Sequence, residues 1–191
     1  MKINTVNNTD FRAKFVNKAY IGKLAENSNG LYLPHQVSFI KIDPFRQSDI
    51  NELKMCAKYW ENANLATNIY YAACALRNKS KFYQEHEVYA LTTQKYGFRH
   101  IDNEKILGLI HICPYFDGST FIEQIQANPK IIYSLVPEFK GIGTAILDSL
   151  KHLTDKITCF PSHNKSTIDF YTRNGFNKHP SLMDGYLWKS R

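Results

Sequence analysis

Two short stretches near the end of the chain carry residue types that could do chemistry. The run from Gly141 to Thr144 reads Gly-Ile-Gly-Thr and opens a predicted helix. The free backbone N–H groups at such a helix start, together with the helix dipole, favour a bound anion. The second stretch, residues 164–176, places Tyr171 one turn before Gly175, which ends a short helix. The pair predicts a cradle for a pyrophosphate beside a phenol that can donate a proton.

A mixed order of strands and helices must hold these two stretches in place. Periodicity predicts strands at 37–42, 87–93, 105–113, 120–127, 157–160 and 182–188. It predicts one helix with its N-cap at Ser48-Asp49 and three further helices over 67–76, 144–155 and 164–174. Residues 105–113 are apolar on both faces, which is typical of a central strand covered on both sides. Asp117-Gly118 predicts a hairpin after this strand.

The start of the chain is predicted to be an extension in front of a single domain. Residues 10–26 have apolar side chains at helical spacing, and 27–30 break the pattern. We therefore expect a partly helical extension at 1–34 and a domain at 35–191. The extension either packs on the domain or contacts a partner.

Composition indicates a globular protein. A chain of 191 residues with a hydrophobic fraction of 43% can build a sizeable core, which excludes disorder of the whole chain. Apolar runs fall far short of the roughly 20 residues that cross a bilayer. The first residues also lack the apolar segment of a secretory signal. We therefore expect a cytoplasmic location without membrane contact.

The charges and cysteines narrow the classes of partner. The formal net charge is +7, and the basic residues are scattered rather than clustered. This pattern fits a solvated surface, or attraction to an anion such as a coenzyme, an acidic protein or a nucleic acid. The four cysteines are widely spaced without a C-x-x-C pair, so we expect reduced core residues and no metal site.

The element order and the two stretches together resemble the GNAT superfamily of N-acetyltransferases. The similarity covers Val37 to Lys189 and is most specific at 141–147 and 164–176. It implies an α/β (mixed α+β) fold whose central, mostly antiparallel sheet of about six to seven strands splays open, flanked by about four helices. It also implies an acyltransferase that binds acetyl coenzyme A in the splay and transfers acetyl directly to an amine in a ternary complex.

The resemblance implies which residues meet the acetyl donor. Backbone N–H groups of the glycine turn would hold the pyrophosphate, and a strand end would pair with the pantetheine. The predicted cofactor-binding residues are Gln126, Ala127, Lys140, Gly141, Ile142, Gly143, Thr144 and Asn164. Asn164 has a second interpretation as a helix N-cap.

Tyr171 and Glu123 are the predicted catalytic residues. The motif match gives Tyr171 the role of protonating the thiolate that leaves; the alternative is a core aromatic. Glu123 lies in the strand that would border the acetyl site, where it is a base that takes a proton from the amine, an anchor for the substrate, or simply exposed to solvent. His111, on the neighbouring strand, is the competing base or a structural histidine.

Two departures from the family pattern concern the cradle. The pattern has Arg or Gln before the glycines, and counting back from Gly141 puts Glu138 there, where a carboxylate would repel a pyrophosphate. In a second alignment, which we favour, Lys140 supplies the cation. The strand that contacts the cofactor is either 121–127 or 131–136. The element order favours the first and makes the residues before the turn an insertion.

Several functions follow as alternatives. The first is an acetyl-CoA-dependent N-acetyltransferase with an unidentified amine acceptor. A variant is a toxin-type enzyme that acetylates an aminoacyl-tRNA, which the positive charge allows. A catalytically inactive binding protein on the same fold is favoured by Glu138 and disfavoured by Tyr171. An adaptor that works through residues 1–34 is a further class. The oligomeric state stays open.

Overall fold

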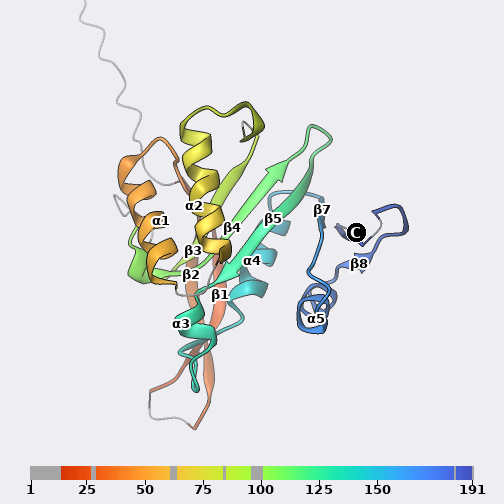
Figure 1. Cartoon of the computed structure of the whole chain (residues 1–191). Helices are drawn as coiled ribbons and strands as arrows, with labels where there is room; N and C mark the ends of the chain where they lie inside the picture. Colours follow the sequence, from red (N-terminus) through yellow and green to blue (C-terminus); the bar gives the residue numbers. More distant parts are fainter. Residues whose placement is uncertain are drawn as a thin grey trace, which may run out of the picture.

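The computed structural model describes residues 14–26, 29–60, 64–83, 85–95, 101–182 and 184–190. These residues form one nine-stranded sheet with the order β6-β1-β2-β3-β4-β5-β7-β9-β8 (Figure 1). The strands are β1 (Lys14–Leu24), β2 (Tyr32–Lys41), β3 (Glu87–Thr92), β4 (Ile106–Pro114), β5 (Ser119–Ala127), β6 (Phe139–Lys140), β7 (Lys156–Cys159), β8 (Asn177–Lys178) and β9 (Tyr186–Lys189). Neighbouring strands are antiparallel except β5 and β7, which run parallel.

Helices cover both faces of this sheet. The described part of the chain contains α1 (Gln47–Tyr59), α2 (Asn64–Arg77), α3 (Pro129–Ile132), α4 (Ile142–Lys151) and α5 (Lys165–Arg173). Helices α1 and α2 lie together on one face and α4 lies on the other (Figure 1). Adjacent residues of β2 enter the two cores, because Phe39 packs with α4 and Ile40 packs with α1 and α2. The mixed α/β fold is therefore confirmed.

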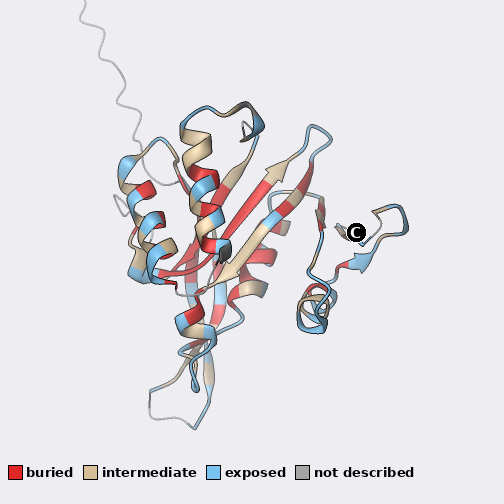
Figure 2. Cartoon of the chain, viewed as in Figure 1, coloured by how far each residue is buried: buried red, intermediate tan, exposed pale blue. Residues whose placement is uncertain are grey.

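The central strand behaves as its sequence predicts. The first seven residues of β4, Ile106 to Ile112, are all buried, and Figure 2 shows this burial along most of its length. Leu109 belongs to the core under α1 and α2, whereas Ile110 belongs to the core under α4. None of the helices in the described ranges has the length and apolar character that crossing a bilayer needs.

Most predicted elements are present with shifted ends. The first five predicted strands correspond to β2, β3, β4, β5 and β7, and the four predicted helices correspond to α1, α2, α4 and α5. Helix α1 begins at Gln47 with Arg46 at its N-cap, so the predicted cap at Ser48-Asp49 is wrong. The last strand begins at Tyr186 rather than at 182, because Pro180–Leu182 forms a 3₁₀ turn.

The helix predicted at the start of the chain is wrong over the described residues 14–26. Residues 14–24 form β1, which pairs antiparallel with β2 along its length. Val16 is an extra residue at a β-bulge, since the pairing jumps from Phe15 to Asn17. The bulge interrupts the two-residue alternation and makes the apolar spacing resemble that of a helix. Residues 10–13 and 27–28 of that prediction lie outside the described part.

The remaining differences are short elements. Strand β1 and the two-residue strands β6 and β8 raise the count of described strands above the predicted six to seven. Helix α3 and β6 occupy the predicted insertion, and β6 pairs with β1 rather than with β5 or β7. The strand beside β7 is thus 119–127, the first of the two alternatives. The division of the chain into an extension at 1–34 and a domain at 35–191 stays a prediction.

Gly108 on β4 sets how closely α4 packs on the sheet. A Cβ atom there would lie 2.7 Å from Ile146 Cδ1 and 3.0 Å from Ile142 Cγ2, both on α4. These distances are shorter than van der Waals contact, so a larger residue must displace the ends of these two side chains or α4 itself. Since the glycine turn opens α4, this contact also fixes the height of the turn above the sheet.

We predict that Gly108→Ala lowers the free energy of unfolding by about 1–3 kcal/mol, the usual cost of overpacking. Ile146→Val, which removes the clashing Cδ1, costs about 1 kcal/mol alone. The double variant should lose at least about 0.5 kcal/mol less than the sum, as expected for residues in contact. Urea denaturation measures each value. Gly108→Ala with Ile50→Val, in the opposite core, is the control and should be additive; equal additivity in both pairs would contradict the contact.

Candidate active site

The sheet opens between β5 and β7. Residues Ser119–Ile122 of β5 pair with β7, and this pairing ends at Ile122 although β5 continues to Ala127. The parting of the two strands leaves one edge of β5 without a β7 partner from Glu123 onward. This opening corresponds to the splay that the resemblance to the GNAT superfamily implies.

Glu123 sits at the point of parting. The pairing between β4 and β5 shifts register there, from His111–Gln124 to Ile112–Ile122, so Glu123 has no opposite residue on β4. Such a β-bulge bends its strand and re-aims the extra side chain. Glu123 is exposed.

A cleft of about 750 Å³ occupies the opening. Strand β5, the residues before α4, the first turn of α4 and helix α5 all contribute to its walls. The sequence-predicted residues that line it are Glu123, Ala127, Lys140, Gly141, Ile142, Gly143, Thr144 and Tyr171. Two predicted residues, Gln126 and Asn164, do not. The fold therefore brings together predicted residues from three separate parts of the chain.

The glycine turn has the backbone geometry that its two glycines allow. Gly141 has φ of 82°, in the left-handed region, and stands at the N-cap of α4. The first N–H groups of α4 lack intrahelical partners and lie at the positive end of its dipole. Gly143 has a packing role as well, because a Cβ there would lie 2.9 Å from the Phe170 ring of α5.

Of the two candidate charges before the turn, Lys140 lines the cleft and Glu138 does not. The Lys140 ammonium lies 4.1 Å from the centre of the Tyr32 ring, on β2. Glu138 is 3.8 Å from the Lys23 ammonium on β1. This placement supports the alignment in which Lys140 supplies the cation, and it removes the objection that Glu138 faces the site.

Tyr171 lines the cleft with a side chain that is only 5% exposed. Its ring packs edge-on against Phe170 and Phe176, with centroids 5.1 and 5.2 Å away. Burial, followed by the charge of Cys159 and a hydrogen bond with it, raises the pKa of Tyr171 well above its usual value. The phenol therefore keeps its proton at neutral pH, so it can give up a proton as an acid but cannot act as a base.

His111 lies away from the cleft, in a pair with a histidine that the sequence analysis missed. His86 Nδ1 and His111 Nε2 are 2.8 Å apart, and the Tyr83 ring packs on both imidazoles. Burial, with a smaller contribution from His86, lowers the pKa of His111 to about 4. Burial also lowers the pKa of His86, an effect that the charge of Glu123 opposes. The pair is thus neutral at pH 7 and lies within electrostatic reach of Glu123.

The two predicted residues outside the cleft have local partners. The Gln126 amide donates to the Ala127 carbonyl at 2.7 Å. Asn164 caps α5, because its side-chain oxygen accepts from Thr167 N at 2.8 Å. Its N-cap interpretation is confirmed. Two other residues in the first turn of α5, Ser166 and Thr167, line the cleft instead. The sequence pattern does not show this, because it depends on the directions in which the side chains point.

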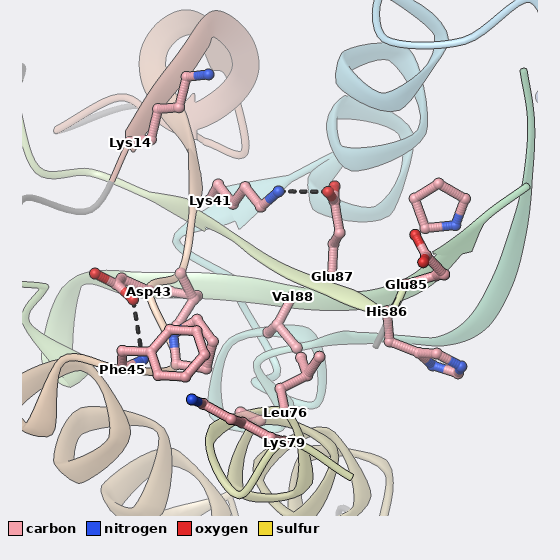
Figure 3. Close-up of a pocket in the computed structure, with 14 residues that line it drawn as sticks. Lys14, Lys41, Asp43, Phe45, Leu76, Lys79, Glu85, His86, Glu87 and Val88 are labelled. Carbon is pink, nitrogen blue, oxygen red and sulfur yellow. Dashed lines mark hydrogen bonds and ion pairs between the residues drawn. The ribbon is translucent and has the colours of Figure 1, made fainter. Parts of the chain in front are cut away.

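A second cavity of about 640 Å³ lies beside the first residues of β3 and the end of α2 (Figure 3). Lys41 and Glu87 form an ion pair across it, and Asp43 accepts a hydrogen bond from Phe45 N at 2.9 Å. His86 lines it, whereas none of the predicted site residues does. All four cysteines are free thiols. The described residues contain no cluster of His, Cys, Asp or Glu that could hold a metal ion.

Comparison of the sequence with family models finds no match, and comparison with curated proteins finds none either. The fold is that of the GNAT-family acetyltransferases. An acetyltransferase of this family from Desulfovibrio desulfuricans has a TM-score of 0.51 at 13% identity, over 80% of this chain and 98% of that one. The N-acetyltransferase PseH from Campylobacter jejuni, in complex with acetyl coenzyme A, has a TM-score of 0.51 at 12% identity, over 80% and 99%.

A third similar structure is a mutant of the toxin AtaT bound to the C-terminus of the antitoxin AtaR. Its TM-score is 0.50 at 11% identity, over 81% of this chain and 92% of that one. At such identities the likeness establishes the fold and leaves the reaction to be argued from this chain's own residues.

We predict that acid destabilises this protein partly through His111. Its pKa is about 4 in the fold and about 6.5 in an unfolded chain, so the unfolded state binds the extra proton between these values. This contribution is fully present above pH 6.5 and is lost as the pH falls toward 4, on the order of 2–3 kcal/mol. Thermal melts from pH 7 to 4 should show a shallower decline for His111→Gln than for the wild type. Parallel declines would contradict the assignment.

Proposed function

We propose that this protein is an N-acetyltransferase that uses acetyl coenzyme A as the acetyl donor and an amine as the acceptor. The observation that carries the proposal is the cleft at the end of the β5–β7 pairing. It gathers the glycine turn, Lys140, Glu123 and Tyr171 around one opening. PseH, which has the same fold, binds acetyl coenzyme A in its solved structure.

The residues of the cleft suit each part of the donor. The start of α4 offers unpaired N–H groups and partial positive charge, and Lys140 adds a full charge, which together fit a pyrophosphate. Beyond Ile122, the edge of β5 that faces the opening has no β7 partner, which suits the amides of an extended pantetheine arm. A volume of about 750 Å³ lies within the usual range for small-molecule sites.

The side chains at the point of parting fit the two proton transfers. Acetyl coenzyme A supplies a thioester carbonyl that an amine can attack directly. Glu123 takes one proton from the amine as the C–N bond forms, and Tyr171 gives one proton to the sulfur as the C–S bond breaks. The proton count balances, and the products are an amide and a free thiol. Burial of Tyr171 keeps its phenol protonated for this role.

The first test is calorimetric titration with acetyl coenzyme A, followed by thiol release in the presence of a panel of amines, peptides and polyamines. We expect the wild type and Tyr171→Phe to bind the donor with similar affinity. Turnover of Tyr171→Phe should fall about 100-fold, the loss typical of a missing general acid. Tyr20→Phe, at an exposed side chain on β1 that does not line the cleft, is the control and should keep wild-type turnover.

The outcomes separate the alternatives. No binding by the wild type at millimolar acetyl coenzyme A would overturn the proposed function. Binding without transfer to any acceptor would favour a non-catalytic binding protein on the same fold. Equal turnover by the wild type and Tyr171→Phe would remove Tyr171 from the mechanism. Glu123→Gln reports on the base in the same assay, and unchanged turnover at every pH would exclude it.

A toxin-type enzyme that acetylates an aminoacyl-tRNA is the second candidate. It is favoured by the net charge of +7 and by the shared fold of the toxin AtaT. If it is correct, induced expression of the wild type in a bacterial culture arrests growth and Tyr171→Phe does not. Equal growth of both cultures would exclude this acceptor and leave the small-amine acceptors in place.

A further inference from the structure

The β1–β2 hairpin contacts the residues that lead into the glycine turn, which gives it a place in the cofactor site. We infer that Tyr32 and Lys23 of this hairpin are positioning residues for the phosphate-binding end of the cleft. Tyr32 holds Lys140 at the cleft, and Lys23 holds Glu138 away from it. The inference rests on the proposed function, because it concerns the same site.

Backbone pairing fixes the hairpin to the turn. Strand β6 pairs with β1 through Gly22–Lys140 and Lys23–Phe139. One residue further, Leu24 N donates to the Glu138 carbonyl at 2.8 Å. These hydrogen bonds join residues more than a hundred positions apart. The stretch that leads into Gly141 is therefore built on β1, rather than being a loop on its own.

Tyr32 contacts both ends of this stretch. Its hydroxyl donates to the Pro137 carbonyl at 2.7 Å, and its ring carries the Lys140 ammonium 4.1 Å from the centroid. Gly22 makes room for this, since a Cβ there would lie 3.2 Å from Tyr32 Cβ. A cation over an aromatic face is attracted by the ring quadrupole. The ammonium has three donors, so the N–H groups turned away from the ring stay available to an anion.

Two opposite charges, on Glu138 and Lys140, lie close together in this stretch. Phe139 is buried in the core under α4, so its neighbours Glu138 and Lys140 both point away from that core. Two such side chains, about 7 Å apart at their bases, can reach each other and form an ion pair. That pair would cancel the positive charge at the glycine turn. The hairpin prevents it by giving each charge a different partner.

Lys23 is the partner of Glu138. Its ammonium lies 3.8 Å from Glu138 Oε1 and also faces the Phe139 ring at 5.7 Å. The Glu138 side chain is 61% exposed, so the pair adds little to stability. Its effect is local: a carboxylate bound to Lys23 on β1 neither repels a phosphate at the turn nor competes for Lys140.

The test measures the dissociation constant of coenzyme A by calorimetry for four chains: wild type, Tyr32→Leu, Lys140→Met and the double variant. Tyr32→Leu should weaken binding about fivefold, as expected for a lost cation–π contact that orients a charge. In the Lys140→Met background the same change should have almost no further effect, because its target is gone. A merely structural role of Tyr32 would weaken binding in both backgrounds.

Matched variants complete the design. Tyr32→Phe keeps the ring and should recover most of the affinity that Tyr32→Leu loses. Tyr20→Leu makes the same change on the same hairpin at a side chain that is 65% exposed, and should bind like the wild type. Lys23→Met should weaken binding about twofold by releasing Glu138, and Glu138→Gln in that chain should reverse the loss.

The results distinguish this inference from the proposed function. If the wild type binds coenzyme A and Tyr32→Leu binds equally well, the inference is overturned and the proposed function stands. The same holds if Tyr32→Leu weakens binding equally with and without Lys140. If the wild type itself does not bind coenzyme A at millimolar concentration, the proposed function fails and the inference falls with it. Full coupling between Tyr32 and Lys140 supports the inference.

Discussion

The end of the hydrogen-bonded pairing between β5 and β7 at Ile122 is the constraint on which the site depends. Up to that residue the sheet is continuous, and beyond it β5 keeps its pairing with β4 while its other edge is free of β7. The bulge at Glu123 lies next to the last pair. A bulge bends its own strand and breaks the ladder locally, so the parting and the re-aimed carboxylate have one cause. Everything that lines the cleft is positioned relative to this point.

On both faces of the sheet, burial favours the neutral form of a titratable side chain. Tyr171, on α5 and in the core beneath α4, keeps its proton because desolvation penalises the phenolate. His111, on the side of α1 and α2, stays neutral because desolvation penalises the imidazolium. In the neutral His86–His111 pair, His111 lies on β4 and His86 lines the second cavity. The charge of Glu123 acts on the pKa of His86. The exposed carboxylate of Glu123 thus shares the cleft with the buried Tyr171 and lies within electrostatic reach of the half-buried His86.

Local signals in the sequence predicted much of the framework and of the cleft. The apolar runs of β4 and α4 and the two glycines of the turn have direct local causes, and Tyr171 and Glu123 do line the cleft. Two of the misses depend on how strands pair, and the third, at Asn164, has a local cause. A single bulge at Val16 shifts the apolar spacing of β1, so the spacing resembles that of a helix. His86 stands before β3, and its approach to His111 depends on a strand register that a long connection does not encode. Asn164 matches the motif, but its side chain caps α5.

The contacts of β1 change how the start of the chain should be understood. Strand β1, which lies within the segment predicted as an extension, is the strand with which β6 pairs. A cradle whose sequence carries a carboxylate where the family has Arg or Gln would be expected to bind phosphate poorly. The repulsion between a carboxylate and a phosphate depends on the distance between them in the folded structure, not on the position of the carboxylate in the sequence. With Glu138 paired to Lys23 and Lys140 held at the cleft by Tyr32, the field at the turn is that of a cation and a helix N-terminus. The Glu138 carboxylate and its Lys23 partner on β1 therefore act together on the charge at the turn.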